Sequence, residues 1–316
     1  MMINHDVYLG QFIKTYVAYS NNPYIRRSGA SGGVMTELMG RLLDNKEIDG
    51  SLVVKMDENN PWLVKTYVAK DSRSLFPSIQ SKYQPVKMIN MFDEIKEKGN
   101  YIVVDKHCNF LDLKKKNKKN KINPKVNISY YFGVFCGFEM TYSATDFMLN
   151  KLNINENNVK SLSYRSGKWP GGFEVNTKDG KVEYLSKDDY SLLSYLTAAP
   201  KCLYCKDQTN ELADISFGDA WFMKENNLGY TCVITRTDRG EKLMQRAIRN
   251  KWITADNVDY NEIRNSHKFL CRYKKLGGQI RINYAKKNHY WIILIQHIIQ
   301  CEKKGHIYAT IFFICS

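Results

Sequence analysis

Residues 200–219 read Pro-Lys-Cys-Leu-Tyr-Cys-Lys-Asp-Gln-Thr-Asn-Glu-Leu-Ala-Asp-Ile-Ser-Phe-Gly-Asp, and the rest of the chain is organised around this stretch. Two residues separate Cys202 from Cys205, a spacing that lets two thiolates turn toward one metal centre. The last seven residues predict a strand that ends at a glycine turn, with a carboxylate on each side. A lone Cys-x2-Cys pair is a weak signal, and it gains weight from Cys108 and Cys136.

Both of those cysteines follow predicted strands. Residues 101–104 are a short apolar run just before Cys108, and residues 128–135 are a second run that leads directly into Cys136. Because α/β sheets place their ligands beyond the carboxyl ends of strands, this position favours a functional site. Strands alternate with helices along the chain, which predicts an α/β fold with an α+β tendency. We expect mixed sheets flanked by helices, with a cofactor site at the C-terminal ends of the strands.

A basic loop of small residues lies nearer the N-terminus. A predicted strand over residues 12–19 is followed by Ile-Arg-Arg-Ser-Gly-Ala-Ser-Gly-Gly at 25–33, and a helical pattern starts at Val34. Bare backbone amides, the positive end of a helix dipole and two arginines together suit phosphate binding. The spacing is neither that of a dinucleotide-binding glycine motif nor that of a P-loop. An ordinary helix capped by Ser31 is the alternative.

Composition describes a folded, basic protein. The 316 residues carry a formal net charge of +15, with 43% hydrophobic and 13% aromatic residues. Such a charge favours anionic partners: nucleic acid, phosphorylated cofactors, an acidic electron carrier or a membrane surface. Seven lysines fall within residues 114–125, and we interpret this run as a solvated loop, with docking of an acidic protein or polyanion as the alternative. No aromatic residues interleave with these lysines, which makes nucleic acid an unlikely partner.

The number of cysteines and the sequences near the two chain ends indicate the cellular compartment of the protein. Eight cysteines are too few for a disulfide-stapled secreted scaffold of this size, and the first ten residues carry no secretory signal, so we expect a cytoplasmic protein. The apolar stretches 290–299 and 307–315 are too short to span a bilayer and predict a packed or partner-facing C-terminal helix, with membrane association as the alternative. We interpret the other four cysteines as buried or incidental thiols: Cys232, Cys271, Cys301 and Cys315.

Several short motifs, taken together in their order along the chain, resemble those of the coenzyme F420 hydrogenase/dehydrogenase beta-subunit family over residues 12–255. No single motif is specific, and the resemblance depends on their order and spacing. The motifs are Arg27-Ser28-Gly29-Ala30-Ser31-Gly32-Gly33, Ser81-Lys82-Tyr83, the two strands that precede Cys108 and Cys136-Gly137, residues 201–207, residues 213–219, and Val233-Ile234-Thr235-Arg236-Thr237 with Gly240-Glu241 behind it.

The resemblance implies a flavin- and iron–sulfur-dependent oxidoreductase subunit that passes electrons between a ferredoxin-like donor and coenzyme F420 or a similar acceptor. It implies FAD and one [4Fe–4S] cluster as cofactors, with coenzyme F420 as a possible substrate. Asp214 and Asp219 then order the cluster-bearing loop rather than transfer protons. The implied cluster ligands are Cys108, Cys136, Cys202 and Cys205, and the implied flavin-binding residues are Arg26, Arg27, Ser28, Gly29, Ser31, Gly32, Gly33 and Lys82.

The domain division follows from the same motifs. We expect an N-terminal flavin-phosphate-binding region over 1–90, an iron–sulfur/flavin oxidoreductase domain over 91–260 and a helical C-terminal extension over 261–316. No cysteine precedes Cys108, so we expect a single cluster that exchanges electrons with a separate iron–sulfur protein or a sister subunit. His107, beside Cys108, is interpreted as a packed or hydrogen-bonded side chain rather than a metal ligand.

Two hypotheses from other classes stay open. Cys202, Cys205 and two of Cys108, Cys136 and His107 could form a tetrahedral zinc site in a protein that docks an anionic partner. The other hypothesis is a degenerate, non-catalytic subunit that keeps the fold and binds a partner through its basic surface. No residue in the sequence identifies the substrate.

Overall fold

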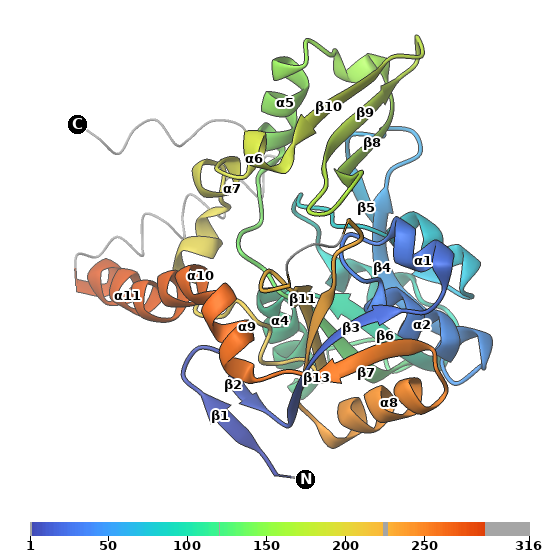
Figure 1. Ribbon diagram of the computed structural model, residues 1–316, viewed down its shortest axis with the longest axis vertical. Coiled ribbons are helices and arrows are strands. Elements are labelled where there is room, and N and C mark those ends of the chain that lie inside the picture. Colours follow the sequence, from blue (N-terminus) through green and yellow to red (C-terminus); the bar gives the residue numbers. More distant parts are fainter. Residues whose placement is uncertain (1, 120, 224–226, 288–316) are drawn as a thin grey trace.

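A central sheet of eight strands carries the fold (Figure 1). The computed structural model describes residues 2–119, 121–223 and 227–287. In sheet order the strands are β13 (Ile253–Asn257), β3 (Lys14–Ser20), β12 (Thr231–Thr235), β11 (Ile215–Asp219), β7 (Val126–Val134), β6 (Gly99–Asp105), β4 (Gly50–Met56) and β5 (Val64–Ala69).

The strand directions bring five C-terminal ends to one edge of this sheet. The pairs β4–β6, β6–β7 and β7–β11 are parallel. Strands β3 and β11 both pair antiparallel with β12, so they point the same way as each other. Consequently β3, β11, β7, β6 and β4 all end at the same edge, while β12, β13 and β5 run the opposite way. The predicted α/β class with mixed sheets and flanking helices is confirmed.

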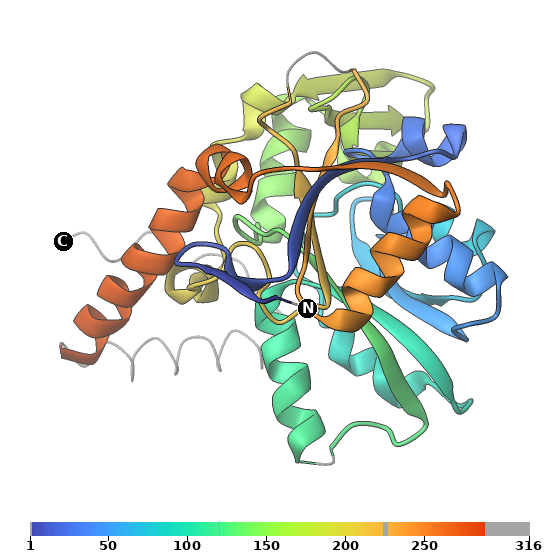
Figure 2. The ribbon, with the colours of Figure 1, turned by 60° about the horizontal axis from the view of Figure 1, so that its bottom comes forward.

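Helices cover both faces of the sheet (Figures 1 and 2). Side chains alternate along each strand: Ile102 packs into the core that contains α2 (Val34–Asp44) and α8 (Asp238–Arg249), whereas Tyr101 and Val103 pack on the other face. That other face is covered by α3 (Met91–Glu94) and α4 (His107–Lys118).

A second, smaller layer lies at the top of Figure 1. It is an antiparallel sheet of β8 (Val159–Ser166), β9 (Gly172–Thr177) and β10 (Val182–Ser186), packed against α5 (Tyr142–Lys151). At the side of the molecule, α9 (Tyr260–Ser266), α10 (Lys268–Arg272), a π-helical turn η5 (Tyr273–Gly277) and α11 (Gly278–Lys287) follow one another.

Short elements complete the description. They are β1 (Asn4–Asp6), β2 (Gly10–Phe12), α1 (Pro23–Ser28), α6 (Lys187–Tyr190), α7 (Leu193–Leu196) and the 3-10 helices η1 (Arg73–Ser78), η2 (Met88–Asn90), η3 (Glu156–Asn158) and η4 (Pro200–Tyr204). Within the described part of the chain, no helix is both long and apolar enough to cross a bilayer. The predictions for residues 290–299 and 307–315, and for Cys301 and Cys315, fall outside the described residues.

Two local predictions need correction. The lysine-rich run is not all loop, because α4 continues to Lys118: Phe110 and Leu113 anchor the helix on the sheet, and lysines suit its C-terminal turn. The arginines at 26 and 27 and Ser28 lie in the short helix α1 rather than in the glycine loop. There the side chain of Asn22 accepts from the first-turn amides, and Pro23 is preorganised for a helix start.

Candidate functional site

The separated sequence motifs meet at the edge of the sheet where the five strands end. The glycine loop 29–33 connects α1, which follows β3, to α2, and Asp219 ends β11. Cys136 lies two residues beyond the end of β7, and Cys108 lies in the first turn of α4, just after β6. This edge is where a sheet of this kind places its ligands. It divides into a cysteine centre and an arginine–aspartate centre.

The cysteine centre gathers the four predicted ligands from three segments. Cys202 lies in η4 and Cys205 ends it, while Cys108 and Cys136 come from the ends of β6 and β7. Burial, together with the thiolates that Cys136 and Cys108 can form, raises the pKa of Cys202 to about 12. Burial likewise raises the pKa of Cys108, and Cys136 adds to that shift. These thiols therefore lie within electrostatic reach of one another.

Lys274, a residue that the sequence analysis missed, is enclosed by this centre. Its ammonium donates to the Cys136 carbonyl at 2.7 Å and lies 3.7 Å from the Cys205 sulfur, although only 1% of the residue is exposed. Burial on its own would lower the pKa of Lys274, but the nearby thiol groups of Cys136, Cys205 and Cys202 outweigh it and raise the pKa. A lysine among core-facing positions of a C-terminal helix is the only signal that could have identified it.

Ion pairs surround the cysteines. The buried carboxylate of Glu139 accepts from Lys106 and, at 2.9 Å, from Lys201, which flanks Cys202. His107 Nδ1 lies 2.6 Å from an oxygen of Asp207. This contact agrees with the interpretation of His107 as a hydrogen-bonded side chain.

The donor set is of the kind that an iron–sulfur cluster takes, since such clusters are held by cysteine thiolates. Among residues 2–119, 121–223 and 227–287, no group of three or more His, Cys, Asp or Glu side chains converges closely enough to hold one metal ion. A four-iron cluster takes four thiolates; here Cys136, Cys202 and Cys205 lie near the buried cation of Lys274, and Cys108 lies within electrostatic reach of Cys136 and Cys202. The residues present therefore fit the cluster.

Arg165 joins the glycine loop, the Ser81-Lys82-Tyr83 motif and the end of β11. Its guanidinium makes two 3.1 Å hydrogen bonds to the Asp219 carboxylate, one of 3.2 Å to the Ala30 carbonyl and one of 3.4 Å to the Tyr83 hydroxyl. Burial by itself would raise the pKa of Asp219, but Arg165 and a hydrogen bond from Ser31 lower it. Arg165 was not predicted, because a single arginine outside the recognised motifs carries no distinguishing local signal.

The glycine loop is held in a shape that only glycine accepts. Gly32 and Gly33 have φ of +72° and +76°. A Cβ on Gly32 would lie 2.4 Å from the Thr231 side-chain oxygen, and one on Gly33 would lie 2.8 Å from the Ile25 carbonyl. Gly33 caps α2 and brings no side chain to its first turn. The amides of Gly29, Gly32 and Gly33 donate to the carbonyls of Ile25, Leu228 and Ser31, so what suits one phosphate of a flavin diphosphate here is the positive end of the eleven-residue helix α2.

The basic residues predicted for the flavin site lie in three different environments. Arg26 is buried. Its guanidinium donates to the carbonyls of Leu228 and Gly229 and stacks on the Tyr19 ring at 4.8 Å, so its hydrogen-bonding groups are used within the protein. Arg27 is exposed beside the loop. Lys82 donates to the carbonyls of Pro77, Ile79 and Gln80, and burial lowers its pKa to about 7.

A hydrogen-bonded path connects the two centres. The Asp219 carbonyl lies 3.0 Å from His267 Nε2, and Gln208 lies 3.1 Å from the other ring nitrogen. The Gln208 carbonyl accepts from the Cys136 amide at 2.8 Å. Cys232 and Cys271 border this path and are both buried, as expected.

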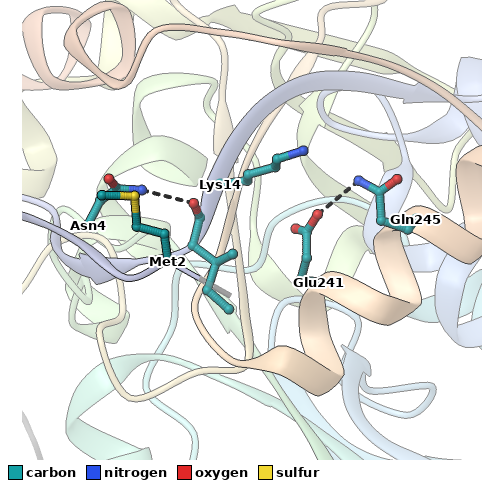
Figure 3. Close-up of a pocket in the computed structure, with 6 residues that line it drawn as sticks. Met2, Asn4, Lys14, Glu241 and Gln245 are labelled. Atoms are coloured by element: carbon teal, nitrogen blue, oxygen red, sulfur yellow. Dashed lines mark hydrogen bonds between the residues drawn. The ribbon is translucent and has the colours of Figure 1, made fainter.

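Two cavities lie at different distances from the sheet edge where the cysteine and arginine–aspartate centres are found. The larger, about 380 Å³, lies at the opposite end of β3 and is lined by Lys14 and Glu241 among others (Figure 3); Glu241 there accepts from Gln245, Tyr16 and Thr235. The smaller, about 250 Å³, lies beside the path just described. It is lined by Tyr195, Trp221, Ser266, His267, Phe269 and Leu270. Its aromatic lining and position make it the more relevant cavity.

Comparison with known proteins gives a consistent result. The C-terminal part of the coenzyme F420 hydrogenase/dehydrogenase beta-subunit family matches residues 98–261, and the N-terminal part of the same family matches residues 15–93. A coenzyme F420-dependent sulfite reductase of Methanocaldococcus jannaschii is 27% identical over 83% of this chain, which spans 41% of that relative. A coenzyme F420 hydrogenase subunit beta of Methanosarcina barkeri is 25% identical, with 77% of this chain and 81% of the relative covered.

A solved structure shares the fold. It belongs to the F420-reducing [NiFe] hydrogenase complex from Methanosarcina barkeri, has a TM-score of 0.70 and 21% identity, and covers 90% of this chain and 96% of its own. The chain spans less than two thirds of the sulfite reductase and 64% of an uncharacterised relative from Methanocaldococcus jannaschii that is 28% identical. The fold of the oxidoreductase subunit is therefore shared across most of this chain.

Proposed function

This chain belongs to the coenzyme F420 hydrogenase/dehydrogenase beta-subunit family, and we propose that it is a flavin- and iron–sulfur-dependent subunit that passes electrons between a ferredoxin-like donor and coenzyme F420 or a similar acceptor. The observation that carries the proposal is the meeting of three cysteine-bearing segments beside the glycine loop at one sheet edge. Bound flavin and cluster would supply hydride and one-electron chemistry, respectively.

The cysteine centre would hold the cluster. Cys108, Cys136, Cys202 and Cys205 would be its ligands. Cys108 lies in the first turn of α4, where the positive end of the helix opposes the effect of burial, which raises the pKa of this thiol. Burial excludes water from Cys202, which is 5% exposed.

The arginine–aspartate centre would hold the flavin. Ser28 and Ser31 would offer hydroxyls to the diphosphate, and Gly29, Gly32 and Gly33, which carry no side chains, would let it approach the N-terminus of α2. The exposed Arg27 would balance its charge. Arg26 would instead support the loop, because its guanidinium is occupied by main-chain carbonyls. Lys82 also donates to main-chain carbonyls, so it would act near the flavin ring or its phosphates by fixing the segment around it.

A cavity and the relatives of this chain indicate an electron acceptor and a partner protein, respectively. The aromatic cavity beside Trp221 and His267 suits a planar acceptor such as a deazaflavin. The relatives include a hydrogenase beta subunit and a chain from a hydrogenase complex, so we propose a sister subunit or a ferredoxin-like protein as the electron partner.

Anaerobic purification tests the proposal directly. The protein would be reconstituted with iron, sulfide and FAD, and assayed for bound flavin, iron and sulfide, for the visible spectrum, and for reduction of coenzyme F420 by a chemically reduced ferredoxin. We expect one flavin and one four-iron cluster per chain. Replacing Cys202 and Cys205 together by serine should abolish the cluster and leave the flavin bound.

Cys232→Ala is the matched control, because Cys232 is a buried cysteine in β12 that is not among the proposed ligands. It should retain the full iron content. A colourless wild-type protein after reconstitution would favour the degenerate, non-catalytic hypothesis, and one zinc per chain without flavin would favour the zinc hypothesis. Either result would end the redox proposal.

A further inference from the structure

The C-terminal helices form one wall of the cysteine centre. Lys274, Gly278 and Arg281 are spaced by four and three residues, so they share one helical face. A Cβ on Gly278 would lie 3.0 Å from the Cys205 carbonyl, so the helix approaches this loop as closely as a glycine allows. Arg281 donates to the Leu203 carbonyl at 2.5 Å and its guanidinium stacks on Tyr273 at 4.1 Å.

Lys274 ties together the segments that carry the cysteines. Its ammonium donates to the carbonyls of Cys136, at 2.7 Å, and Asp207, at 3.1 Å, and lies 3.7 Å from the Cys205 sulfur. One contact comes from the segment after β7 and two come from the segment after η4. The π-helical turn that contains Lys274 is the kind of helix irregularity that often occurs at functional sites.

The charge of Lys274 needs an anion. A buried ammonium is costly unless an opposite charge compensates it, and main-chain carbonyls are neutral. The Asp207 carboxylate is already paired with His107 and with the amides of Asn210 and Glu211. A [4Fe–4S] cluster with four thiolates is anionic when oxidised and gains one more negative charge when reduced. A fixed cation beside it therefore favours the reduced state.

We propose that Lys274 is a positioning residue that clamps the cysteine-bearing segments and raises the reduction potential of the cluster. The inference rests on the proposed function, since it requires the cluster. It concerns a residue beyond the matched family range, which ends at residue 261. It also gives the C-terminal helices a role in the redox centre.

The test compares three variants of the full chain, reconstituted anaerobically with iron and sulfide. Lys274→Met removes the charge and keeps the length, and Lys274→Arg keeps the charge. Lys206→Met is the matched control, because Lys206 adjoins Cys205 in sequence but is exposed and bonded to Gln279. Iron and sulfide content is measured first, and the midpoint potential of the cluster is then followed by a spectroscopic redox titration.

We expect Lys274→Met to shift the midpoint potential to a more negative value, with Lys274→Arg close to wild type and Lys206→Met unchanged. Loss of the cluster from Lys274→Met but not from Lys274→Arg would also support the proposal. An unchanged potential in Lys274→Met, or loss of the cluster from both Lys274 variants, would overturn it. Wild-type protein without iron would instead refute the proposed function.

Discussion

Arg165 illustrates how one side chain can hold a site together. It belongs to the small sheet, yet its guanidinium reaches Asp219 at the end of β11, Ala30 in the glycine loop and the hydroxyl of Tyr83. Its side chain is 3% exposed and that of Asp219 is 18% exposed. Such a pair contributes little net stability compared with apolar residues, but breaking it leaves a buried charge without a partner.

Asp219→Asn should lower the free energy of unfolding by about 3 kcal/mol, because it removes the anion that Arg165 requires. The double variant Arg165→Met/Asp219→Leu should recover part of that loss. Urea denaturation of the two variants and wild type measures both effects. Glu97→Gln, which breaks the exposed pair between Lys70 and Glu97, should leave stability unchanged. A double variant less stable than Asp219→Asn would contradict this account of the pair.

The same pair should make stability depend on pH. Burial tends to raise the pKa of Asp219, but Arg165 brings it below its ordinary value on balance. A carboxyl whose pKa is lower in the folded state stabilises the protein above its unfolded-state pKa, about 3.9, and loses that contribution as the pH falls further. The stability gap between wild type and Asp219→Asn should therefore be constant from about pH 7 to pH 5 and shrink below about pH 4. Urea denaturation across this range measures the gap, and a gap that widened in acid would contradict the assignment.

At the scale of elements, the passage from β3 to α2 brings the predicted phosphate site to the strand ends. The Gly32 carbonyl accepts from the Ser20 amide, and the Thr231 hydroxyl donates to the Ser31 carbonyl at 2.5 Å. The loop is thus fastened both to the strand that precedes it and to β12. Its shape is fixed before any ligand binds, which lowers the entropy cost of binding.

Gly32→Ala should destabilise the protein by about 2 kcal/mol and reduce flavin retention, because it combines a left-handed backbone with a clash against Thr231. Gly180→Ala is the control: Gly180 also has a positive φ, +89°, but open space surrounds it. It should cost about 1 kcal/mol and leave the flavin content unchanged. Thermal unfolding and flavin extraction measure both. Equal losses in the two variants would mean that the contact with Thr231 is unimportant.

The sequence could predict the elements of the site but not the contacts between them. The strands before Cys108 and Cys136 are visible because their apolar runs are local, and the glycine loop is visible because glycines precede a helical pattern. Arg165 and Lys274 were missed because their partners lie up to 138 residues away in the chain. The extent of α4 was missed because Phe110 and Leu113 stabilise a lysine-rich helix through contacts with the sheet.

At the scale of the whole molecule, the cysteine centre is a junction. It joins the ends of β6 and β7 in the large sheet to η4, and the C-terminal helices close over it through Lys274. Backbone contacts across this junction, among the described residues, include hydrogen bonds from the Ala199 amide to the Glu139 carbonyl, from the Thr141 amide to the Thr197 carbonyl and from the Cys136 amide to the Gln208 carbonyl. A cluster held by all three segments would add bonds to these contacts.

Removing the cluster should therefore lower the melting temperature of the whole chain. A ligand that binds only the folded state stabilises it, and a gain of about 3 kcal/mol corresponds to several degrees for a chain of this size. Wild-type protein would be compared by anaerobic calorimetry with and without iron and sulfide reconstitution. The melting temperature should rise on reconstitution for wild type and for Cys232→Ala, and should stay constant for the Cys202→Ser/Cys205→Ser variant. A rise of the same size in that double variant would show that iron stabilises the chain at another place. The three cysteine-bearing segments would then be held together by side-chain packing and hydrogen bonds, without a cluster.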